Sequence, residues 1–158
     1  MVEVREPGRL TDGEMRTLYE ILVEIANEIM GELGSGFNES VYQSAFAYEL
    51  RRRGIWFQRE PHIEVIYKGI PLALDRPDFI IRPCEGDLLT ITKPYILELK
   101  AVKRLNDSHK IQLRNYINSV AHSSDLTLRS CIAGILINFA DSGSVEHIML
   151  VKEVEHEG

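Results

Sequence analysis

Pro77-Asp78-Phe79-Ile80-Ile81 and Tyr95-Ile96-Leu97-Glu98-Leu99-Lys100 are the two stretches that decide the fold. Both contain short apolar runs of the kind that form strands, and residues 82–94, which contain Pro and Gly, connect them. We therefore expect a hairpin with a long connection. Alternate side chains of a strand share one face, so Glu98 and Lys100 should point the same way while Leu99 points into the core. Antiparallel pairing would then bring Asp78 beside Glu98.

This arrangement predicts a metal-dependent site. Two neighbouring carboxylates repel each other unless a cation lies between them, and hard oxygen ligands suit Mg²⁺ or Mn²⁺. Lys100 would hold or activate the water that attacks a phosphorus, or stabilise the charge that develops there. The alternative is ordinary, because charged residues are common at strand ends: Asp78, Glu98 and Lys100 could simply be surface groups.

The rest of the chain predicts the layers around this hairpin. Apolar residues at helical spacing, with Thr11 as N-cap, predict a helix over residues 12–33, and further helices are expected over 38–53 and 107–120. Strands are expected at 55–59, 63–67, 70–74, 79–81, 95–99, 131–139 and 145–151. We therefore expect a single α/β domain over residues 11–158, with a mixed central sheet flanked by helices, preceded by a flexible arm, residues 1–10.

Composition excludes several classes of protein. The 158 residues are 44% hydrophobic and 27% charged, as in ordinary globular domains. No apolar run is long enough to span a membrane, and we expect no signal peptide. The two cysteines, Cys84 and Cys131, are far apart in sequence, so we expect no disulfide framework and a reducing, cytoplasmic location. A net charge of −6 argues against coating nucleic acid by bulk charge.

Four blocks of the sequence resemble a known family in content and order. They are Gly36-Phe37-Asn38-Glu39-Ser40-Val41-Tyr42, Arg76-Pro77-Asp78-Phe79, Ile96 to Val102, and His109 through Gln112 to Tyr116, followed by a strand, Gly134 to Phe139. Together they resemble the PD-(D/E)XK nuclease superfamily, and within it the GxxExxY group of the RecB-like branch. The resemblance implies a restriction-endonuclease-like fold and a Mg²⁺- or Mn²⁺-dependent nuclease acting on DNA, with RNA not excluded.

The resemblance also assigns roles to single residues. It implies that Glu39 reaches the metal as a third carboxylate beside Asp78 and Glu98, with the Leu99 carbonyl as a further ligand. Glu39 also has a structural interpretation, because an acidic residue at a helix start favours the positive end of the helix dipole. Glu49, ten residues further along the same helix, lies too far away to share the metal.

The helix after Lys100 carries a second set of candidates. Gln112 and Tyr116 are four residues apart and share a helix face with His109. They resemble a Q-x-x-x-Y helix in which the glutamine touches the water or phosphate and the tyrosine contacts the substrate backbone. Alternatively, Tyr116 is half-buried core and Gln112 is solvated. His109 is either a phosphate contact or a plain surface residue.

Local basic charge favours a polyanionic substrate. Lys103, Arg104, Lys110 and Arg114 flank the candidate site, and we expect them to contact phosphates. A second cluster, Arg51-Arg52-Arg53 with Arg59, is more simply a solvated face. The connection over residues 82–94 is longer than is usual in the group, and Asn38 stands where an apolar residue is more usual. Neither departure removes a proposed ligand.

Two rival functions remain open from the sequence. One is a catalytically silent module that kept the nuclease fold and binds nucleic acid or a protein partner. The other is a structural homodimer that pairs through its edge strands. All four of Glu39, Asp78, Glu98 and Lys100 are present, whereas a decayed module would be expected to have lost one. This completeness favours the enzyme.

Overall fold

The computed structural model describes residues 2–6, 8, 10, 12–87 and 89–153. Its helices are α1 (Gly13–Leu33), α2 (Glu39–Arg52) and α3 (Asp107–Val120), with a 3₁₀ turn, Leu128–Ser130. Its strands are β1 (Val2–Arg5), β2 (Phe57–Arg59), β3 (Ile63–Tyr67), β4 (Ile70–Asp75), β5 (Phe79–Ile81), β6 (Cys84–Glu85), β7 (Thr90–Ile91), β8 (Tyr95–Lys100), β9 (Ala133–Phe139) and β10 (Val145–Lys152). No helix in this described part is long and apolar enough to cross a membrane.

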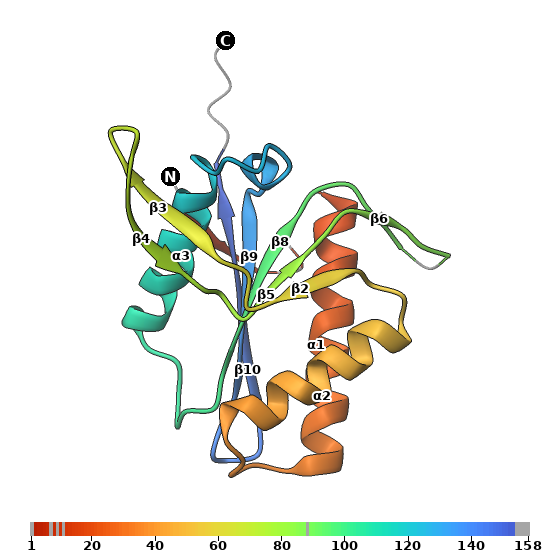
Figure 1. Cartoon of the computed structure of the whole chain (residues 1–158). Helices are drawn as coiled ribbons and strands as arrows, with labels where there is room; N and C mark the ends of the chain where they lie inside the picture. Colours follow the sequence, from red (N-terminus) through yellow and green to blue (C-terminus); the bar gives the residue numbers. More distant parts are fainter. Residues whose placement is uncertain (1, 7, 9, 11, 88, 154–158) are drawn as a thin grey trace.

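Six strands form the central sheet in the order β1-β10-β9-β8-β5-β2. The β8–β9 pair is parallel and the other pairs are antiparallel, so the sheet is mixed. Helices α1 and α2 cover one face and α3 covers the other (Figure 1). This confirms the expected α/β domain of restriction-endonuclease-like architecture.

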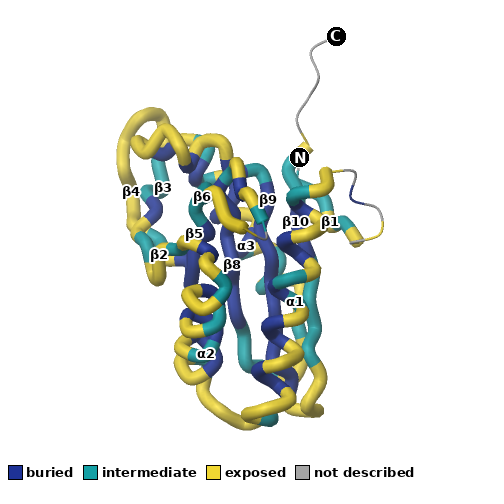
Figure 2. The backbone as a smooth tube through the Cα atoms, turned by 90° about the vertical axis from the view of Figure 1, so that its right-hand side faces the viewer, coloured by how far each residue is buried: buried dark blue, intermediate teal, exposed yellow. Residues whose placement is uncertain are grey.

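The two faces of β8 follow the expected alternation. Tyr95, Leu97 and Leu99 pack into the core beneath α1 and α2, whereas Ile96 packs into the core beneath α3. Glu98 and Lys100 have the same parity as Ile96 and therefore lie on the α3 face. The hairpin of β3 and β4 stands apart from the central sheet, with β4 exposed almost throughout while β8 is buried (Figure 2). Its β3 strand contacts α3.

Local chemistry explains where the helices begin and end. The Asp12 side chain accepts a hydrogen bond from the Met15 backbone N–H at 3.1 Å and caps α1, whereas the expected cap, Thr11, lies outside the described residues. Gly54 follows the end of α2 with φ of 72°, a conformation that favours glycine. Lys68 and Gly69 form the turn between β3 and β4, with positive φ at both residues.

The expectation of a flexible arm over residues 1–10 is wrong for Val2–Arg5. These residues form β1 and pair antiparallel with β10, from Val2 opposite Lys152 to Arg5 opposite Met149. The backbone of β1 pairs with N–H and C=O groups of β10 that would otherwise lie unpaired at an edge of the sheet. The alternating Val-Glu-Val-Arg sequence is too short to have predicted this pairing.

Gly134 lies where α3 packs tightly against the sheet. A Cβ at this position would lie 2.6 Å from the Leu113 side chain and 3.3 Å from the Ile96 carbonyl oxygen. The residue opposite Gly134 across the parallel pair is Ile96, in the strand that carries Glu98. Close packing of α3 against β8 and β9 therefore depends on the absence of a Cβ at Gly134.

We expect Gly134→Ala to lower the free energy of unfolding by about 1–3 kcal/mol, because the added methyl group forces Leu113 or the backbone to shift. Gly31→Ala is the matched control. Gly31 lies within α1 with nothing within 4 Å of an added Cβ, so this change should stabilise the protein by about 0.5–1 kcal/mol. Urea unfolding of both variants measures the difference, and equal stability of the two would contradict the packing argument.

Candidate active site

Asp78 and Glu98 occupy opposite positions on two paired strands. In the β5–β8 ladder Phe79 pairs with Leu97, and the next position outward places Asp78 across from Glu98. The Asp78 backbone N–H donates to Glu98 Oε1 at 2.6 Å, and the Leu99 backbone N–H donates to Asp78 Oδ2 at 2.7 Å. Each carboxylate is thus fixed by the backbone of the other strand, and the expected juxtaposition is confirmed.

Both carboxylates are buried, which is unusual for acidic side chains. Asp78 is 8% exposed and Glu98 is 3% exposed. Burial, opposed in part by the Leu99 N–H, raises the pKa of Asp78 to about 6. Burial and the charge of Asp78 raise the pKa of Glu98 to about 8. At neutral pH this pair therefore resists carrying two negative charges, so a cation would be favoured between them.

Lys100 supplies the positive group nearest to this pair. Its Nζ lies 4.0 Å from Glu98 Oε2. Its charge lowers the pKa of both carboxyls, although less than burial raises them. The Lys100 side chain is partly exposed. The expected placement of Glu98 and Lys100 on one face is confirmed.

Gln43, which the sequence reasoning missed, is the third group that holds Asp78. It lies on α2, is only 7% exposed, and its Nε2 donates to Asp78 Oδ1 at 2.7 Å. The only signal in the sequence was its position four residues after Glu39, which places the two side chains on the same helix face. A glutamine on an otherwise amphipathic helix gives no indication of a partner 35 residues away.

Tyr42 explains how α2 is held at the site. Its ring stacks on Phe139 of β9, with centroids 4.2 Å apart and planes 6° apart. Its hydroxyl donates to the Gly34 carbonyl oxygen at 2.7 Å, in the turn that leads to Glu39. Gly36 in the same turn has φ of 96°, which favours glycine. The glycine and tyrosine of the GxxExxY sequence thus fix the start of α2.

Glu39 begins α2 and is partly exposed. Its charge raises the pKa of both Asp78 and Glu98, so it lies within electrostatic range of the pair. However, no three Asp, Glu, His or Cys side chains in the described residues are close enough together to form a metal ligand set. The structure therefore does not gather Glu39 with Asp78 and Glu98 in one cluster, and its role as a third ligand stays a prediction.

A buried asparagine holds the loop that follows Lys100. Asn138, fully buried in β9, accepts from the Val102 N–H at 2.9 Å and donates to the Val102 carbonyl oxygen at 3.0 Å. Its amide also donates to Glu146, which accepts from the Leu105 N–H. This loop carries Lys103 and Arg104, which are both exposed.

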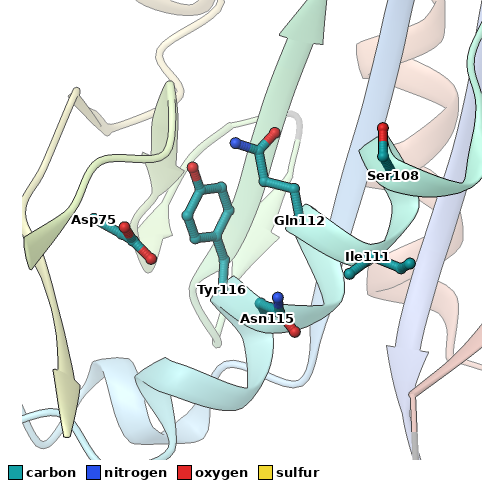
Figure 3. A pocket seen from close by; sticks show the side chains of 6 residues that line it. All are labelled: Asp75, Ser108, Ile111, Gln112, Asn115 and Tyr116. Carbon is teal, nitrogen blue, oxygen red and sulfur yellow. The ribbon is translucent and has the colours of Figure 1, made fainter. Parts of the chain in front are cut away.

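The remaining candidate site residues on α3 lie on different faces of the helix. Gln112 and Tyr116 lie together, with the Gln112 amide beside the Tyr116 hydroxyl (Figure 3). Tyr116 is 6% exposed, so it is more buried than the half-buried core residue of the alternative interpretation. Burial, and then the charges of Glu98, Asp75 and Asp78, raise its pKa. Lys110 and Arg114 are each two residues from Gln112 and so point about 160° away from it.

His109 has a structural role at the start of α3. Asn106 caps this helix, and the Asn106 backbone N–H donates to His109 Nδ1 at 3.1 Å. Burial, and then the charge of Lys100, lower the pKa of His109. A neutral ring whose Nδ1 accepts a hydrogen bond fits a capping box better than a phosphate contact.

Comparison with known proteins agrees with this geometry. An α/β sheet that brings Asp78, Glu98 and Lys100 together at the end of an antiparallel strand pair has the form of a nuclease site of the PD-(D/E)XK type. The chain belongs to the PD-(D/E)XK nuclease superfamily, whose family model matches residues 16–150. No curated protein and no solved structure matches it significantly.

Replacement of Glu98 tests the electrostatics of the pair. Because the folded-state pKa of Glu98 is raised, the folded protein binds more protons than the unfolded chain between pH 4.5 and about 8, and stability should fall as pH rises through this window. Glu98→Gln removes the titration and keeps an acceptor for the Asp78 N–H. We expect its melting temperature in EDTA to equal or exceed that of the wild type at pH 8, with a flatter pH dependence.

Glu32→Gln, an exposed residue of α1, is the control and should leave the pH dependence unchanged. A large loss of stability in Glu98→Gln at pH 8 would instead identify Glu98 as a structural partner of Lys100.

Proposed function

We propose that this chain is a divalent-metal-dependent nuclease that hydrolyses phosphodiester bonds in DNA. The single observation that carries the proposal is the buried pair of Asp78 and Glu98 with Lys100 beside it, at the open end of two paired strands. We further infer membership of the GxxExxY group of the RecB-like branch. In support, the glycine and the tyrosine of this motif, Gly36 and Tyr42, fix the turn that leads into α2.

The donor set fits Mg²⁺ or Mn²⁺. Asp78 and Glu98 offer carboxylate oxygens whose mutual repulsion a divalent cation would relieve, and hard oxygen ligands suit these metals. We propose that Asp78, Glu98, the Leu99 carbonyl and Glu39 hold the metal. When bound, such a metal lowers the pKa of a coordinated water and neutralises charge on the phosphate.

The other residues act by positioning and by charge. Gln43 and the Leu99 N–H fix the Asp78 carboxylate, so its orientation does not depend on the substrate. Lys100 is placed to donate a hydrogen bond to the attacking water or to an oxygen of the reacting phosphate. Gln112 is proposed to contact that water or phosphate. Lys103 and Arg104 are proposed to bind phosphates outside the reacting centre.

A cleavage assay with DNA and RNA substrates, with and without Mg²⁺ or Mn²⁺, tests the proposal directly. We expect metal-dependent cleavage that Asp78→Ala abolishes, and Mn²⁺ binding by calorimetry that the same change weakens strongly. Glu32→Gln is the control and should match the wild type in both measurements. Equal Mn²⁺ binding by Asp78→Ala would put the metal elsewhere. DNA binding without cleavage under every condition would favour the silent module.

Lys100→Ala separates catalysis from binding. If the ammonium acts in the transition state, the cleavage rate at saturating substrate should fall by at least roughly a hundredfold. Affinity for DNA in Ca²⁺ should change far less, because one phosphate contact is a fraction of the total. Lys103→Ala should do the reverse, weakening binding with a modest effect on the bound rate. Wild-type cleavage by Lys100→Ala would remove the central support for the mechanism.

A further inference from the structure

A polar groove runs along α3 away from the candidate active site. It consists of two hollows of about 290 Å³ and 360 Å³ between α3 and the β3–β4 hairpin, and both are lined by Asp75 and Asn115. Figure 3 shows the first hollow, with Asp75 on β4 facing Tyr116 and Gln112 on α3. Asn118, Ser119 and His122 line the second hollow, further along the helix.

The groove begins at the site of the proposed reaction. Gln112 and Tyr116 line the first hollow, and Tyr116 is close enough to Asp78 and Glu98 for their charges to act on it. A strand whose phosphate lies at Asp78 and Glu98 could therefore continue into the groove. The spacing of Ser108, Gln112, Asn115 and Ser119 along α3 keeps these polar side chains on one face of the helix.

The lining of the groove suits bases and not phosphates. None of the described residues that line the two hollows is Lys or Arg, and Asp75 stands where both hollows meet. A carboxylate repels phosphate but accepts hydrogen bonds from the amino groups of bases. Asparagine amides both donate to and accept from base edges. Ile111 and Ile66 add apolar surface on which a base can lie.

The positive charge of the helix lies elsewhere. Lys110 and Arg114 point to the side of α3 away from Gln112, and Lys103 and Arg104 are on the loop before the helix. A duplex keeps the Watson–Crick edges of its bases paired, and its remaining base edges lie in grooves flanked by phosphates, so a duplex would bring phosphates towards Asp75. Only an unpaired strand offers free Watson–Crick edges to the groove.

We propose that the groove between α3 and the β3–β4 hairpin binds the bases of a single-stranded segment of the nucleic-acid substrate. The inference rests on the proposed function, because it names the strand state of the substrate at that same site. Asn115 and Asn118 contact base edges, and Asp75 turns phosphates away from the groove. Selection for an unpaired strand thus follows from amide and carboxylate groups and not from bulk charge.

Binding measured by fluorescence anisotropy in Ca²⁺ tests the proposal without cleavage. The probes are labelled 12-nucleotide strands of mixed sequence: single-stranded DNA, its duplex, the matching RNA, and a DNA strand with abasic sites in place of its bases. We expect the single strand to bind more tightly than both the duplex and the abasic strand. The RNA strand shows whether the sugar matters in addition to the bases.

Variants then localise the preference to the groove. Asn115→Ala and Asn118→Ala should each weaken binding of the single strand about 3- to 10-fold, the scale of one lost hydrogen bond, and leave the abasic strand unaffected. Gln58→Ala removes an exposed amide on β2, outside the groove, and should bind like the wild type. Circular dichroism and melting temperature confirm that each variant is folded.

The proposal would be overturned by equal binding of normal and abasic strands, by duplex binding as tight as that of the single strand, or by unchanged binding in both asparagine variants. Absence of binding to every probe would overturn it as well. Cleavage is scored separately. Base-dependent binding without cleavage would support the proposed groove and contradict the proposed nuclease activity. Metal-dependent cleavage without strand preference would support the nuclease activity and contradict the groove.

Discussion

The pair of hydrogen bonds that joins the Asp78 and Glu98 carboxylates to the backbone of the opposite strand is the constraint on which the site depends. Each carboxylate accepts a backbone N–H from the opposite strand, so neither side chain can move without losing a hydrogen bond at the end of the β5–β8 pair. Two buried like charges destabilise the fold, and hydrogen bonds to the charged form offset only part of this penalty. The two carboxylates therefore repel each other at this end of the sheet, and a bound cation would relieve that repulsion.

The rest of the chain holds this unfavourable arrangement in place. Tyr42 of α2 stacks on Phe139 of β9, and this contact holds α2 where Gln43 reaches Asp78. Asn138, also on β9, anchors the loop after Lys100 on the other side of the site. Both anchors are long-range contacts to the strand that pairs in parallel with β8. A buried, almost entirely apolar central strand thus positions both the helix before and the loop after the strand pair that carries Asp78 and Glu98.

The sequence predicted those parts of the site that depend on local periodicity. Alternation along a strand places Glu98 and Lys100 on one face, and antiparallel pairing brings Asp78 opposite, so these three residues could be found by counting. The role of Gln43 could not be predicted, because it depends on how α2 crosses the end of β5. The pairing of β1 with β10 likewise depends on a long-range contact that no local pattern encodes. The capping role of His109 is local, but the capping-box pattern has Glu or Gln at this position and so did not point to a histidine.

Charge distribution connects the fold to the proposed substrate. A protein with a net charge of −6 gains little from general attraction to nucleic acid, so recognition must be local. Lys103 and Arg104 extend from the loop that Asn138 holds, whereas the groove along α3 is lined by amides and Asp75. Phosphate contacts at the loop would fix the position of the backbone, and uncharged contacts in the groove would test whether the bases are free. The loop and the groove have no lining residue in common, so one surface would hold the strand while the other would select a strand whose bases are unpaired.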